Sequence, residues 1–157
     1  MEIAVITYMI EIPSDVRIIS TLKQGMVYYF IEESFSSDEA HYFIVLNKDP
    51  RGDPNLLLVC ASSKVEKRKK YAKQFGYAPE TLVIVQPSEY TCFTVETVID
   101  CNTIIEKNIH TIVTKLTEEK LRIYTEQIPQ AIIEKLVNGV KMSNQHSEVI
   151  KDKIFDN

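Results

Sequence analysis

The sequence predicts an α+β fold, in which a small antiparallel β-barrel or sandwich is followed by about three helices. Residues 25–105 hold five or six short runs rich in β-branched and aromatic side chains, with turn residues between them. From about residue 106 the apolar side chains recur at the spacing of an amphipathic helix. A chain of 157 residues fits one domain. We therefore expect a single domain, 1–157, with a barrel core at 25–105 and a helical extension at 106–157.

A predicted β-hairpin at residues 41–63 forms the centre of the barrel. Its apolar runs, 42–46 and 56–60, flank a segment rich in Asp, Pro and Gly, which are strong turn signals. The apolar residues are continuous rather than alternating, so both faces of each strand should be covered. Because an antiparallel hairpin brings its outer ends together, we expect His41 to lie close to Ser62.

The remaining elements are predicted from composition and spacing. Further strands are expected at 26–31, 82–85, 90–93 and 97–104, and residues 3–12 are expected to form a strand or a short helix. Helices are expected at 109–116, 128–137 and 145–155, with Gly139 just after the second and Ser143 or Asn144 as the cap of the third. The basic segment 64–73 is expected to be the loop by which the chain leaves the hairpin.

Composition excludes several classes of protein. The chain has only four glycines and no glycine-rich phosphate-binding motif. Its three cysteines form no C-x-x-C pair and no zinc spacing with the three histidines. We therefore expect reduced thiols, a cytoplasmic location, no metal and no cofactor. The apolar N-terminal stretch carries Glu2 and is too short to span a bilayer, so neither a signal peptide nor a membrane segment is predicted.

Segment 64–73 is the one local charge anomaly. It holds six basic residues and one acidic residue, a net +5 in a chain of net charge −4, so the rest of the chain carries −9. One interpretation is phosphate binding with Tyr71 available to stack on a base. The other is a solvated loop or helix whose lysines aid solubility. The candidate RNA-binding residues of this segment are Lys64, Lys67, Arg68, Lys69 and Lys70.

Polar residues at the strand ends are the candidates for chemistry. His41 can act as an acid or a base near neutral pH, or it is simply a strand-end histidine. Ser62 and Ser63 can contact phosphate, or they merely end a strand. Asp100 and Asn102 alternate on one predicted strand and therefore share a face, which is either a polar site or a solvent-facing surface.

These segments together resemble the PemK/MazF/Kid toxin family. The likeness covers residues 25–29, 41–46, 57–63 and 97–102, and it includes Gly25 and Tyr28 in the first strand and the Ser62-Ser63 pair, where the family has Thr-Ser. His41 stands where the family usually has Arg-Pro. Asp100-Cys101-Asn102 stands where some members have a segment similar to Arg-Cys-Asp. Both family arginines are thus absent.

The resemblance implies an SH3-like barrel that cleaves single-stranded RNA without a metal and is inhibited by an antitoxin. It implies His41, Asp100 and Ser62 as catalytic residues, RNA contacts from Ser63, Asn102 and the basic segment, and a homodimer. The absent arginines favour an alternative, a non-catalytic barrel that binds RNA or a protein. A third interpretation is an assembly domain whose C-terminal helices form a dimer face.

Overall fold

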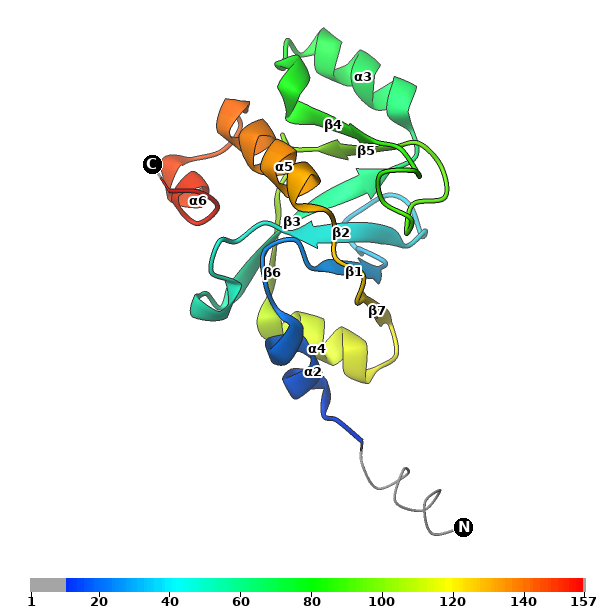
Figure 1. Ribbon diagram of the computed structural model, residues 1–157, viewed down its shortest axis with the longest axis vertical. Coiled ribbons are helices and arrows are strands. Elements are labelled where there is room, and N and C mark those ends of the chain that lie inside the picture. The colour runs from blue at the N-terminus through cyan, green and yellow to red at the C-terminus, as the bar shows by residue number, and fades with distance from the viewer. Residues whose placement is uncertain (1–10, 157) are drawn as a thin grey trace.

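The computed structural model describes residues 11–156, so most of the strand or short helix predicted at 3–12 lies outside the described residues. Seven strands form an antiparallel sheet (Figure 1) in the order β4-β5-β3-β2-β1-β7, with β6 paired to β3 off this path. The strands are β1 (Val27–Phe30), β2 (His41–Val45), β3 (Asn55–Ser62), β4 (Leu82–Val85), β5 (Thr97–Asp100), β6 (Ile105–Asn108) and β7 (Leu121–Tyr124).

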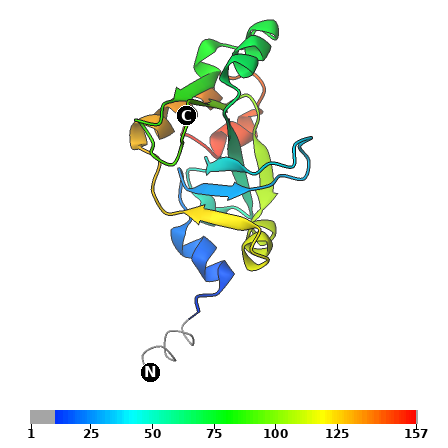
Figure 2. The ribbon, with the colours of Figure 1, turned by 90° about the vertical axis from the view of Figure 1, so that its right-hand side faces the viewer.

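Helices cover both faces of this sheet. They are α2 (Ser14–Thr21), α3 (Val65–Gln74), α4 (Ile109–Thr117), α5 (Gln130–Met142) and α6 (Glu148–Asp152), with 3-10 turns η1 (Pro50–Gly52) and η2 (Pro79–Thr81). Figures 1 and 2 show α2 and α4 side by side at one end of the molecule and α3 beside β4 and β5 at the other end. The described residues contain no helix long and apolar enough to cross a bilayer.

The predicted hairpin is confirmed, and its second strand is the centre of the sheet. β2 and β3 pair with Phe43 opposite Cys60 and Val45 opposite Leu58. The first half of β3 also pairs with β6, and its end pairs with β5. The α+β class and the antiparallel sheet are therefore confirmed. The predicted closed barrel is not, because no pairing among residues 11–156 joins the edge strands β4 and β7.

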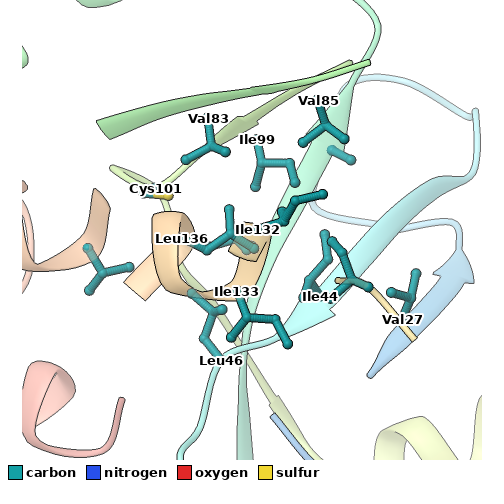
Figure 3. Packing of buried hydrophobic residues seen from close by; sticks show 14 of the residues in the cluster. Val27, Ile44, Leu46, Val83, Val85, Ile99, Cys101, Ile132, Ile133 and Leu136 are labelled. Atoms are coloured by element: carbon teal, nitrogen blue, oxygen red, sulfur yellow. The ribbon is translucent and has the colours of Figure 1, made fainter. Parts of the chain in front are cut away.

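Apolar side chains pack on both faces of the sheet, as the continuous apolar runs predict. Figure 3 shows one core, in which Ile132, Ile133 and Leu136 of α5 lie against Ile44 and neighbouring strand residues. The core on the other face places Ile18 of α2 and Ile112 of α4 against alternate strand residues such as Phe43 and Leu58. Successive residues of β3, from Leu56 to Val59, are all fully buried for this reason.

Two strand predictions are corrected, and two strands, β6 and β7, were not predicted. Residues 90–93 form turns instead of a strand. The ring of Tyr90 is buried, and its hydroxyl donates a hydrogen bond at 2.8 Å to the backbone carbonyl of Glu126, which lies in another loop. This contact holds the segment in its turn conformation. The strand predicted at 97–104 ends at Asp100, and the chain turns at residues 101–102 before β6 begins. β7, which pairs along its length with β1, was not predicted.

Three helix predictions also change. The basic segment forms most of α3 rather than a loop, because Val65 and Ala72 fall on one face of the helix and are buried. Gly139 lies inside α5 and not after it. Ser147 caps α6 by accepting a hydrogen bond from the backbone N–H of Ile150, where Ser143 or Asn144 was expected to cap the helix.

Candidate functional site

A cavity of about 540 Å³ lies between the start of α3 and the loop at residues 31–40. Its floor consists of residues of β1, β2, β3 and β5, and the loop at residues 86–96 supplies a further wall. The pairing of β2, β3 and β5 brings these segments together at the end of the predicted hairpin.

Strand register places four chemically active side chains on one face of the cavity floor. Phe43 pairs with Cys60, and successive side chains of a strand alternate between the two faces, so His41 and Ser62 share the face of this pair. Ala61 pairs with Ile99, so their neighbours Cys60 and Asp100 lie on the opposite face, which is the face of His41 and Ser62. All four residues line the cavity.

Seven of the ten residues predicted from sequence come together here. The cavity lining includes His41, Ser62, Ser63, Lys64, Lys67, Arg68 and Asp100. Lys69, Lys70 and Asn102 are not part of that lining. Lys69 lies 3.6 Å from the Glu66 carboxylate and forms an ion pair with it along the exposed side of α3.

Asn102 is held in a buried polar network behind the cavity. Its side-chain amide donates to the hydroxyl of Thr81 at 2.8 Å, and its carbonyl oxygen accepts from Ser143 at 2.9 Å. Its backbone N–H donates to Asp100 at 2.9 Å. Asn102 thus connects η2, the end of β5 and the end of α5, and it also restrains the carboxylate of Asp100.

The cavity is a mixed-charge site with an excess of cations. Its lining includes three cations, Lys64, Lys67 and Arg68, and two carboxylates, Glu39 and Asp100. Ser62 accepts a hydrogen bond from the backbone N–H of Lys64 at 3.1 Å, which fixes the turn from β3 into α3. That turn directs the first basic residues of α3 toward the cavity. Such a site attracts an anionic ligand and still retains groups that can move protons.

His41 sits in an aromatic setting at the start of β2. Its ring lies edge-on to Phe35, with centroids 5.7 Å apart, and 6.5 Å from the ring of Phe43. Its Nδ1 is buried and has no hydrogen-bond partner among residues 11–156. A buried polar atom without a partner is costly and occurs often at functional sites. The neighbouring Cys60 is no rival nucleophile, because burial raises the pKa of its thiol to about 12.

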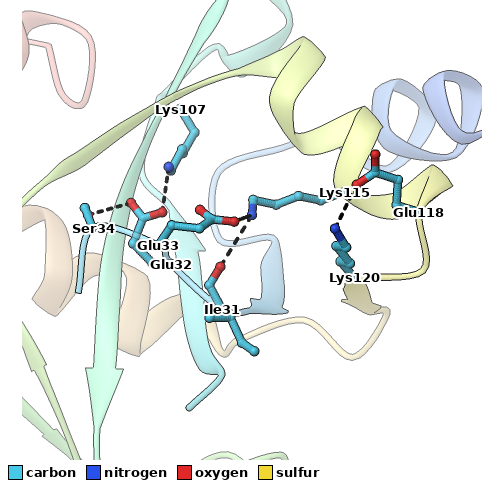
Figure 4. Close-up of polar contacts among 8 residues, drawn as sticks. All are labelled: Ile31, Glu32, Glu33, Ser34, Lys107, Lys115, Glu118 and Lys120. Carbon is cyan, nitrogen blue, oxygen red and sulfur yellow. Dashed lines mark hydrogen bonds and ion pairs between the residues drawn. The ribbon is translucent and has the colours of Figure 1, made fainter. Parts of the chain in front are cut away.

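Ion pairs anchor the loop that forms the wall opposite α3 (Figure 4). Glu32 is buried and lies 2.6 Å from the ammonium of Lys107 on β6, and it accepts a hydrogen bond from Ser34 at 3.0 Å. Glu33 pairs with Lys115 of α4, and this hydrogen bond lowers the pKa of the carboxyl to about 2. The first turn of the loop is thus fixed to the sheet and to α4.

A tyrosine cluster beside the cavity was not predicted as part of the site. Tyr29 and Tyr42 line the cavity, and their ring centroids lie 4.7 Å apart. The Tyr42 hydroxyl lies 3.5 Å from that of Tyr124 on β7, which also accepts a hydrogen bond from Arg122 at 3.2 Å. These two hydrogen bonds lower the pKa of Tyr124. In sequence, aromatic residues inside apolar runs look like core residues, so no signal distinguished them.

Fold and cavity together define the class as an α+β protein with an antiparallel sheet that presents a basic and aromatic cavity at the end of its central hairpin. No protein-family model matches the sequence, and no curated protein matches it. Among solved structures, the chain is similar to an endoribonuclease in complex with its cognate antitoxin from mycobacterial species. That similarity has a TM-score of 0.46 and 12% sequence identity, and it covers 76% of this chain and 89% of that chain.

Proposed function

We propose that this protein is a metal-independent endoribonuclease that cleaves single-stranded RNA in the cavity beside α3. The observation that carries the proposal is the convergence of His41, Ser62 and Asp100 with three basic residues in one cavity. A histidine, a carboxylate and a cluster of cations are the groups that RNA cleavage by internal attack requires. The resemblance of residues 25–105 to the PemK/MazF/Kid family supports the same chemistry.

The proposed reaction uses the ribose 2′-hydroxyl as nucleophile. Asp100, whose carboxylate accepts two hydrogen bonds from Asn102, takes the proton of this hydroxyl while the hydroxyl oxygen attacks the adjacent phosphorus. The bond from phosphorus to the 5′-oxygen breaks, and His41 is the counterpart that supplies a proton to this leaving oxygen. The products are a 2′,3′-cyclic phosphate and a free 5′-hydroxyl. Unpaired RNA is the expected substrate because its nucleotides can turn into a cavity.

The other cavity residues are proposed to bind phosphate. Ser62 and Ser63 offer hydroxyl groups at the end of β3, and Lys67 and Arg68 project from the first turns of α3. A guanidinium can contact two phosphate oxygens at once and stabilise the charge that develops in the transition state. Arg68 of α3 gives the cavity an arginine, although this chain lacks both arginines that the resembled family carries at the ends of its strands. Lys64 adds positive charge that steers RNA to the site.

Cleavage of labelled single-stranded RNA in EDTA tests the proposal. We expect the wild-type protein to cut, and His41→Ala to reduce the rate by about 100-fold or more, the usual contribution of a general acid or base. His110→Ala is the matched control, because His110 is an exposed histidine of α4 outside the cavity. Its rate should equal that of the wild type.

Two results would contradict the enzyme. His41→Ala could cut as fast as the wild type, which would remove His41 from the chemistry. The wild type could bind RNA without cutting it, in a manner that salt weakens and neutralisation of residues 67–70 abolishes. This second result supports the non-catalytic alternative, a domain that binds RNA.

The family resemblance also implies an antitoxin partner, which we propose occupies the same basic cavity. An acidic protein segment would complement Lys64, Lys67 and Arg68. The expected homodimer stays a prediction. Its interface is not the apolar stripe of α5, because Ile132, Ile133 and Leu136 are buried in the chain's own core.

A further inference from the structure

A cluster of three aromatic rings, two of them exposed and one partly buried, lies on α3 and the turn that follows it. The side chains of Tyr71 and Phe75 are 46% and 54% exposed, and their ring centroids are 4.4 Å apart. The ring of Tyr77 lies 6.0 Å from that of Phe75 and stacks with it at an interplanar angle of 25°. None of the three belongs to either apolar core. Large apolar rings gathered at a surface commonly mark a binding site.

The aromatic cluster continues directly from the cavity. Lys67 and Arg68 line the cavity. On the same helix, Tyr71 follows Lys67 by four residues and Arg68 by three. Residues three or four apart share a helix face, so Tyr71 is next to both, and Phe75 follows Tyr71 by one more turn. At 1.5 Å per residue, Phe75 lies about 10 Å beyond Arg68 along the axis. A strand that leaves the cavity past Arg68 thus meets Tyr71 first and Phe75 next.

The charge around the rings identifies the kind of ligand. Five of the ten residues of α3 are basic and one is acidic, and Lys70 and Lys73 are exposed beside the aromatic residues. The cores of protein–protein interfaces are depleted in lysine, and a second copy of this chain would bring like charges together. Surfaces that bind single-stranded nucleic acid combine basic side chains with rings on which bases stack.

We propose that the exposed side of α3 is a second binding surface for single-stranded RNA, on which Tyr71, Phe75 and Tyr77 stack with bases that lie outside the cavity. This inference rests on the proposed function, since the RNA is the strand whose scissile phosphate occupies the cavity. The surface adds affinity for longer RNA and takes no part in the chemical step. It thereby makes the protein prefer substrates that extend beyond the cleavage site.

The test compares two fluorescently labelled mixed-sequence RNAs, of about four and about sixteen nucleotides, which span the site sizes of single-strand binders. The double variant Tyr71→Leu/Phe75→Leu keeps apolar bulk and removes the rings. We expect its affinity for the longer RNA to fall about tenfold and its affinity for the shorter RNA to stay unchanged. The matched control is Tyr71→Phe/Phe75→Tyr, which exchanges the two rings and should bind as the wild type does. In cleavage of the longer RNA, KM should rise while kcat is unchanged.

The outcomes separate this inference from the proposed function. Cleavage with equal KM in the Leu variant and the wild type overturns the stacking surface alone. Binding of the longer RNA without cleavage, weakened in the Leu variant, supports the surface and contradicts the nuclease. If the Leu variant instead loses self-association in sedimentation while its RNA affinity is unchanged, the rings serve a protein contact and the inference is wrong.

Discussion

The ion pair between Glu32 and Lys107 is the clearest single-residue determinant of the site. The Glu32 side chain is 2% exposed, and Lys107 is 18% exposed at 2.6 Å from it. A carboxylate this deeply buried is tolerated because it is paired and because Ser34 donates a second hydrogen bond to it. The pair fixes the start of the loop that carries the cavity wall at Ser36 and Ser37.

Removal of Lys107 should therefore be strongly destabilising. In Lys107→Met the aliphatic packing is largely kept, but Glu32 is left buried without its counter-charge, which costs about 3 kcal/mol of unfolding free energy. Urea unfolding measures this loss. Glu32→Gln in the same chain should restore most of it, because a neutral amide needs no counter-charge.

The matched control for this prediction is an exposed ion pair. Lys120 lies 3.3 Å from Glu118, and the two side chains are 67% and 50% exposed. Lys120→Met should change the unfolding free energy by less than about 0.5 kcal/mol, because solvent screens such pairs. Equal effects of the two lysine substitutions would show that the pair with Glu32 is not structural.

At the residue level, the sequence predicted the convergence of the site better than the role of each member. The convergence of His41 and Ser62 on one cavity could be predicted because an antiparallel hairpin brings its outer ends together. The sequence could not show that Asn102 lies outside the cavity lining, because its hydrogen-bond partners Thr81 and Ser143 are distant in the chain. The tyrosines beside the cavity carry no local signal that distinguishes them from core residues.

At the level of elements, long apolar runs were predictable and short mixed ones were not. β2 and β3 are continuous apolar stretches, so strand formation and burial on both faces followed from composition. β7 has four residues, including the exposed Arg122, and it forms because it pairs with β1, more than ninety positions earlier in the chain. α3 looked like a solvated loop because only Val65 and Ala72 of its ten residues are buried.

Gly139 shows how helix packing overrides a local signal. A glycine near a helix end predicts a terminus, yet Gly139 is buried within α5 where the helix passes close to η2 and Cys101. A Cβ atom at this position would lie 2.7 Å from the Sγ of Cys101 and 3.0 Å from the backbone carbonyl oxygen of Glu80. The absence of a side chain therefore allows the close approach of α5.

Gly139→Ala should accordingly destabilise the fold, although alanine is the better helix former. Overpacking of this kind costs about 1–3 kcal/mol of unfolding free energy, which thermal or urea unfolding measures. Cys101→Ala removes the nearest atom and should recover part of the loss in the double variant. A variant with stability equal to or above that of the wild type would show that α5 can move away from Cys101 at little cost.

At the level of the whole molecule, the sheet separates structural from functional surfaces. One face is covered by α5 and α6 and the other by α2 and α4, and these contacts form the two apolar cores. The end of the sheet between α3 and the loop at residues 31–40 is hollowed into the cavity that holds the candidate site. Charge is also unevenly spread over the molecule. The net charge is −4, yet the helix beside this cavity, α3, is basic.

This charge distribution predicts the salt dependence of RNA binding. Each phosphate contact on a single strand contributes about −0.7 to the slope of log K against log salt concentration. If Lys64, Lys67 and Arg68 each contact a phosphate, their joint replacement by Met should weaken binding and make the slope less steep by about 2. Measurement of RNA affinity by anisotropy across a salt series gives both numbers.

The control replaces three other cations and keeps the same change in net charge. Lys23, Lys120 and Lys135 are exposed and lie outside the cavity lining. Their joint replacement by Met lowers the overall positive charge equally but removes no proposed phosphate contact, so the slope should stay that of the wild type. Counterion release counts only the cations at which phosphates bind, so the two triple variants should differ in slope. Equal changes of slope would mean that RNA responds to the net charge of the protein and not to the cavity.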